Sequence, residues 1–342
     1  MSERDIYVAI AQKLDFPLTE RFERLLRKTV SPQEGQILLA SPAPVPQLAE
    51  TSGMSATEVD GKLREFVARG LAIPTRKGHF FSRSMIQFHD ATLASVDKYV
   101  DRELLNLWED FASNEWYPSF AKRMVEADQA RDRVIPHRKA LQSTAGLQPY
   151  EDVEAIVSAA SRWTTVPCTC RRQSHKCDYP VGVCLQLDRS AEYNIDRGAG
   201  PDLSKEEALA IIAQAADAGL IHQVPNRRAD FGVICNCCTD CCVIFRPLLT
   251  HYPDQLDRGF AKSRFEATVD SELCNGCQLC VDRCQLGAIE MTRVAGSKRL
   301  KASVIGAKCW GCGACVTGCT EDAATLLLVR PLEYIPEAVA TH

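Results

Sequence analysis

Residues 274–284 read CNGCQLCVDRC, and residues 309–319 read CWGCGACVTGC. Both runs space four cysteines as Cys-x-x-Cys-x-x-Cys-x-x-x-Cys. A tight loop with this spacing can place successive thiolates around one inorganic core, and Gly276, Gly311 and Gly313 let the backbone approach that core closely. The doubled run therefore predicts iron–sulfur ligation. A zinc site or a disulfide framework is the alternative, but zinc sites rarely use two such four-cysteine runs, and nothing in the sequence suggests the secretion that a disulfide framework would need.

Residues 265–330 resemble a bacterial two-cluster ferredoxin. In that family the fourth cysteine of each run ligates the cluster of the other run, so the resemblance implies two [4Fe-4S] clusters with crossed ligand sets. The first set is Cys274, Cys277, Cys280 and Cys319, and the second is Cys309, Cys312, Cys315 and Cys284. The proline that usually follows the fourth cysteine is replaced by Gln285 in one run and by Thr320 in the other.

Length and composition are those of a globular protein. The chain has 342 residues, enough for two or three domains, and its 46% hydrophobic and 25% charged residues argue against extended disorder. The formal net charge of −4 is too small to predict nucleic acid or an anionic membrane as a partner. No signal-peptide pattern or membrane-spanning stretch is present, so we expect a cytoplasmic protein. In that reducing compartment its 17 cysteines predict metal ligands or redox thiols.

Residues 1–90 carry the pattern of a winged helix-turn-helix. Capping boxes are expected at Ser31–Glu34 and Ser55–Glu58, and a hairpin is expected around the turn Lys77–Gly78. The pattern resembles the winged-helix fold of MarR-like and ArsR-like regulators. However, the expected recognition helix begins with Glu58 and Asp60, and acidic and basic residues nearly balance over this region. We therefore expect a docking module, with nucleic acid an unlikely partner.

A second group of cysteines precedes the ferredoxin runs. Residues 91–163 are expected to form a helical linker region, and residues 164–262 a cysteine-rich domain whose central helix is capped by Ser204 and Glu207. Nine thiols in this domain exceed what packing would use, so they predict an additional metal centre held by an unknown subset of them. The candidate ligands are Cys168, Cys170, Cys177, Cys184, Cys235, Cys237, Cys238, Cys241 and Cys242.

The metal of this centre is left open by the spacing. An iron–sulfur centre is preferred because the neighbouring domain already commits the protein to that chemistry. Zinc is the alternative, although the spacings do not match the usual paired Cys-x-x-Cys knuckles. His175 is either a further ligand or a solvated loop residue, and Arg171 and Arg172 beside Cys170 could raise a cluster's potential or lower a thiol's pKa.

The sequence thus predicts an α+β multidomain protein: an N-terminal winged helix, a helical, cysteine-rich middle domain, and a ferredoxin-like domain with a C-terminal tail at residues 263–342. The segments PCTCRRQ, VCLQ, HQVPN and ICNCC followed by the ferredoxin runs resemble a family of bacterial ferredoxin-type proteins with an N-terminal winged helix. That resemblance implies an electron-transfer component of anaerobic metabolism.

No dinucleotide fingerprint, P-loop or metalloprotease motif is present, so the substrate chemistry is expected to belong to a partner. We therefore expect a carrier that passes low-potential electrons to or from a larger oxidoreductase. Two alternatives come from other classes. One is a redox-sensing transcriptional regulator, and the other is a reductase with an active-site cluster in the middle domain.

Overall fold

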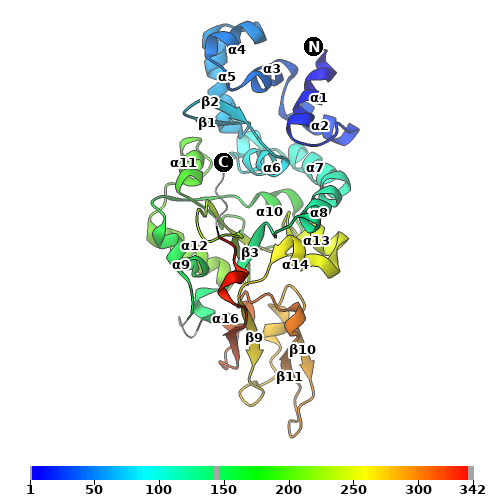
Figure 1. Cartoon of the computed structure of the whole chain (residues 1–342), viewed down its shortest axis with the longest axis vertical. Coiled ribbons are helices and arrows are strands. Elements are labelled where there is room, and N and C mark those ends of the chain that lie inside the picture. Colours follow the sequence, from blue (N-terminus) through cyan, green and yellow to red (C-terminus); the bar gives the residue numbers. More distant parts are fainter. Residues whose placement is uncertain (1, 142–145, 338–342) are drawn as a thin grey trace. The chain divides into compact units, whose positions relative to one another are not determined.

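The computed structural model describes residues 2–141 and 146–337 (Figure 1). The chain divides into two compact units. Unit 1 comprises Met1–Tyr117, Val166–His175 and Tyr193–Pro201, and unit 2 comprises Pro118–Thr165, Lys176–Glu192 and Asp202–His342. Each unit is therefore built from three separate segments of the sequence. The division into four consecutive domains at residues 90, 163 and 262 remains a prediction.

Unit 1 is mostly helical. Its elements are α1 (Glu3–Lys13), α2 (Glu20–Thr29), α3 (Pro32–Ala40), α4 (Val45–Ser52), α5 (Ala56–Arg69), β1 (Ala72–Thr75), β2 (Gly78–Phe81), α6 (Met85–Leu93), α7 (Arg102–Phe111) and α10 (Thr169–Ser174). Both expected capping boxes form, at the starts of α3 and α5. The expected hairpin is β1 paired with β2, with Arg76 and Lys77 at its turn. These elements follow the expected order, and the winged-helix fold itself remains a prediction.

Unit 2 contains a six-stranded sheet in the order β4-β5-β7-β6-β3-β8. The strands are β3 (Asp132–Ile135), β4 (Trp163–Val166), β5 (Cys184–Leu187), β6 (Ile221–Pro225), β7 (Val233–Cys237) and β8 (Phe260–Ala261). The expectation of a helical middle domain is therefore incomplete. Most of these strands have only four or five residues, too few to show a period of two clearly in the sequence.

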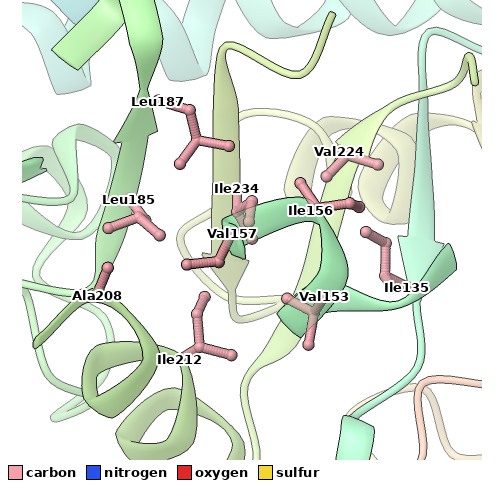
Figure 2. Close-up of a cluster of buried hydrophobic side chains, with 10 residues drawn as sticks. All are labelled: Ile135, Val153, Ile156, Val157, Leu185, Leu187, Ala208, Ile212, Val224 and Ile234. Atoms are coloured by element: carbon pink, nitrogen blue, oxygen red, sulfur yellow. The ribbon is translucent and has the colours of Figure 1, made fainter. Parts of the chain in front are cut away.

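Two helices pack on this sheet. Figure 2 shows Val153, Ile156 and Val157 of α9 (Val153–Ala159) beside Ile212 of α12 (Lys205–Asp217), close to apolar side chains of β3, β5, β6 and β7. The capping box expected at Ser204 and Glu207 begins α12. Burial of this apolar face fixes the position of α12, whose C-terminal end leads into β6.

The ferredoxin-like part of unit 2 contains two antiparallel strand pairs and two short α-helices. β9 (Phe265–Val269) pairs antiparallel with β12 (Ala324–Leu328), and β10 (Ile289–Thr292) pairs antiparallel with β11 (Lys301–Val304). α15 (Leu279–Asp282) and α16 (Ala314–Thr317) each begin inside a cysteine run.

The α-helices not yet named lie outside the ferredoxin-like part. They are α8 (Tyr117–Glu126), α11 (Asp188–Asp196), α13 (Phe245–His251) and α14 (Leu256–Gly259).

Candidate metal centres

The first candidate site is a cavity near α15. It is lined by the four cysteines expected for the first cluster, Cys274, Cys277, Cys280 and Cys319. The rest of its lining is largely apolar and includes Val269, Ala302, Ala323 and Ala324. Cys277 is exposed to solvent, whereas Cys274 is buried. The structure thus brings together four sulfurs from both cysteine runs around one apolar space.

The second candidate site lies near α16. Its lining includes Cys284, Cys309, Cys312 and Cys315, the second crossed set expected from the sequence. Gly311 has φ +67°, and a Cβ there would lie 2.1 Å from the Phe265 carbonyl oxygen. Glycine is therefore required at this position both for its backbone conformation and for the close approach of the chain.

Without a metal, burial disfavours the thiolate form of the cysteines in these cavities. Burial raises the pKa of Cys312 to about 12, and burial also raises the pKa values of Cys315 and Cys280. A bound metal reverses this preference because it requires and stabilises the thiolate. Backbone N–H groups of Ala267 and Ala288 already donate to the sulfurs of Cys309 and Cys284, at 3.3 and 3.2 Å. Such donors favour the charged sulfur, so the residues present fit a cluster.

Residues outside the cysteine runs contact the second run. The backbone N–H of His137 donates to the Cys312 carbonyl oxygen at 2.8 Å, and its Nε2 lies 2.7 Å from the Leu220 carbonyl oxygen. Burial lowers the pKa of His137 well below its ordinary value, so this imidazole is neutral. In the neutral imidazole, Nε2 carries the hydrogen and donates a hydrogen bond to the Leu220 carbonyl oxygen. Sequence reasoning missed this role, because His137 lies far from the cysteines along the chain.

Gln285 connects the second cavity to the middle cysteines. Its Nε2 donates to the Gly219 carbonyl oxygen at 2.7 Å, and its Oε1 accepts a hydrogen bond from the Thr239 backbone N–H at 2.9 Å. Gln285 directly follows the ligand candidate Cys284, where two-cluster ferredoxins usually have proline. The departure from the family pattern therefore has a structural explanation, since proline could make neither of these bonds.

Three of the nine middle cysteines lie close together in unit 2. Cys177 Sγ lies 3.6 Å from both Cys238 Sγ and Cys241 Sγ, and the three sulfurs all lie within 4.8 Å of one another. We call these three residues the thiol trio. Of the other six, Cys235, Cys237 and Cys242 are neighbours around the Gln223 side chain, Cys184 begins β5, and Cys168 and Cys170 belong to unit 1.

The other residues noted beside Cys170 have their own environments within unit 1. Arg172 Nη1 donates to the carbonyl oxygens of Leu93 and Ser95, at 3.0 and 2.7 Å. This guanidinium therefore provides hydrogen-bond donors to backbone carbonyl groups at the C-terminal end of α6. Arg171 is buried. His175 ends α10 in the left-handed conformation, with φ 49°. Arg172 thus joins α10 to the end of α6 within unit 1.

Comparison with known proteins identifies one part of the chain. Residues 273–323 match the 4Fe-4S dicluster domain family. No curated protein and no solved structure matched the chain. The match spans both cysteine runs, and it supports an iron–sulfur, ferredoxin-type protein. Among the described residues, no helix is long and apolar enough to cross a membrane.

Proposed function

We propose that the protein is an electron carrier with two [4Fe-4S] clusters that serves a larger oxidoreductase. The observation that carries this proposal is the separation of the eight ferredoxin cysteines into two cavities, each lined by one crossed set of four. In this proposal Cys274, Cys277, Cys280 and Cys319 hold one cluster, and Cys309, Cys312, Cys315 and Cys284 hold the other. The match to the dicluster family over residues 273–323 supports the same assignment.

Bound clusters of this type accept and release single electrons, generally at low potential. The chain contributes the surroundings. It places the sulfurs among apolar side chains, provides amide donors to Cys284 and Cys309, and leaves Cys277 exposed at the first cavity. A redox partner would approach on this exposed side. Unit 1 would serve as a docking module, and the middle cysteines would hold a further metal centre.

The proposal is tested on the full chain purified without oxygen. Two [4Fe-4S] clusters require roughly eight irons and eight acid-labile sulfides per chain in addition to any further centre. Cys315→Ser should remove about four of each and abolish the electron paramagnetic resonance signal of one reduced cluster. Cys274→Ser should remove the other signal. Thr320→Ala, which changes an exposed residue that is not a ligand candidate, should keep both. Unchanged iron in both cysteine variants would contradict the proposal.

A further inference from the structure

The thiol trio differs from the ferredoxin cysteines in how closely its sulfurs lie. Cys177 comes from the segment before β5, whereas Cys238 and Cys241 lie in the turn that follows β7. Although these segments are about sixty residues apart along the chain, Cys177 Sγ lies 3.6 Å from each of the other two sulfurs. The eight ferredoxin cysteines instead line two cavities.

This spacing discriminates between two kinds of metal centre. Thiolates bound at about 2.3 Å to one tetrahedral ion lie about 3.8 Å from one another. In a [4Fe-4S] cubane each thiolate binds a different iron, so the ligand sulfurs are held apart by the core. The separations of 3.6 Å in the trio match the first arrangement.

The backbone around the trio is arranged for sulfur that accepts hydrogen bonds. The backbone N–H of Tyr179 donates to Cys177, and that of Lys176 donates to Cys241. N–H donors of this kind neutralise part of the charge on metal-bound thiolates and fix their orientation. Two of the three sulfurs therefore have this outer support before any metal is considered.

We propose that Cys177, Cys238 and Cys241 are three ligands of a single tetrahedral divalent ion, zinc or ferrous iron, distinct from both clusters. This proposal rests on the further metal centre in the proposed function and names its ligands and type. The ion would close the turn that contains Thr239, whose N–H donates to Gln285 beside Cys284. The site thus supports one wall of the second cavity.

The test uses the full chain purified without oxygen. Mass spectrometry measures its zinc and iron content, and a separate assay measures its acid-labile sulfide. The wild type should carry one metal ion per chain beyond the iron that the sulfide accounts for. Cys241→Ala and Cys238→Ala should each lower the occupancy of that ion at least tenfold and leave the sulfide unchanged. Val243 provides a matched control, because it is a buried residue of the same segment with no ligand atom in its side chain, and Val243→Ala should retain the ion.

Two measurements on the wild type keep the test independent of mutant folding. If the extra ion is zinc, its X-ray absorption should show at least three sulfurs at about 2.3 Å. If it is iron, the Mössbauer spectrum should contain a high-spin ferrous component besides the clusters.

Loss of about four irons with four sulfides in Cys241→Ala would overturn the single ion in favour of a cluster. A wild type with no extra metal would overturn the site. Either result would leave the two-cluster assignment intact, because that assignment depends on Cys274→Ser and Cys315→Ser.

Discussion

At the scale of single residues, Gln285 shows how a departure from a family pattern can carry information. The two halves of the ferredoxin-like part differ at this position, since Thr320 occupies it in the second run. Gln285 makes two hydrogen bonds to the middle region of unit 2, whereas Thr320 is exposed and its hydroxyl donates to the adjacent Glu321, at 3.4 Å. Only one half of the repeat is thus joined to the rest of the unit through this residue.

Replacing Gln285 by alanine should therefore weaken the second cavity. The change leaves the Thr239 N–H and the Gly219 carbonyl without this partner, and a lost hydrogen bond to a buried group costs about 1–3 kcal/mol. We expect the free energy of unfolding to fall by an amount in this range, and iron to be lost faster from the site that contains Cys284. Denaturant unfolding and iron release to a chelator would measure the two effects. Thr320→Ala is the matched control. It should change the free energy of unfolding by less than about 0.5 kcal/mol and leave the rate of iron release unchanged.

At the scale of elements, α5 bears on whether unit 1 binds DNA. Three basic residues of this helix pair with carboxylates: Lys62 Nζ lies 3.0 Å from Glu34, Arg69 Nη1 lies 2.8 Å from Glu34, and Arg64 Nη1 lies 2.6 Å from Asp60. DNA affinity depends strongly on Lys and Arg side chains that neutralise phosphates. Pairing within the protein offsets this contribution.

We therefore expect no binding of the full chain to duplex DNA with the salt dependence of a phosphate-contacting protein. Fluorescence anisotropy of a labelled duplex, between about 50 and 200 mM salt, would measure it. Dissociation constants tighter than about 10⁻⁶ M that weaken steeply with salt would contradict this expectation and revive the regulator hypothesis.

Glu34 joins α3 to α5 and makes the stability of unit 1 depend on pH. Burial alone would raise the pKa of this carboxyl, but the Ser31 N–H, Arg69 and Lys62 outweigh it and lower the pKa from 4.5 to about 2. Because the pKa is lower in the folded state, the carboxylate stabilises the fold fully above about pH 4.5, and this contribution is lost as the pH falls through about 2.

Glu34→Gln should consequently reduce hydrogen-exchange protection of α3 and α5 at pH 6, compared with wild type under the same conditions. The difference between the two proteins should shrink as the pH is lowered from about 4.5 towards about 2. Comparing both proteins at each pH removes the intrinsic pH dependence of exchange. A difference that stays constant over this range would show that Glu34 does not act through its charge.

The features that were predictable from the sequence are those encoded by neighbouring residues. The capping boxes at Ser31, Ser55 and Ser204 formed as expected, because each requires only residues three positions apart. The spacing within each run likewise predicted iron–sulfur ligation, whereas the two crossed sets that line the cavities were implied by the resemblance to two-cluster ferredoxins. The sheet of unit 2 and the thiol trio were not predictable, since β3 pairs with β6 and Cys177 meets Cys238 only after long stretches of chain have folded together. Nothing local in the sequence encodes these contacts.

At the scale of the whole molecule, the rest of unit 2 makes the two ferredoxin cavities unequal. A segment outside the cysteine runs contacts the second set through the bond from His137 to Cys312, and Cys309 and Cys315 are only 6% and 7% exposed. At the first cavity Cys277 is exposed and Leu279 is 43% exposed. Oxygen and water therefore reach the first set of sulfurs more readily, although the two runs have the same cysteine spacing.

This asymmetry predicts that air destroys the two clusters at different rates. Cys315→Ser should leave only the cluster at the first cavity, and Cys274→Ser only the cluster at the second cavity, whose cysteines are less exposed. On exposure to air, the Cys315→Ser protein should release its remaining iron several-fold faster than the Cys274→Ser protein, and the wild type should show both phases. Chelator absorbance would follow the release, with metal content at time zero as the control for loading. Equal rates, or faster release from the Cys274→Ser protein, would mean that the lower exposure of the second set of cysteines does not protect its cluster.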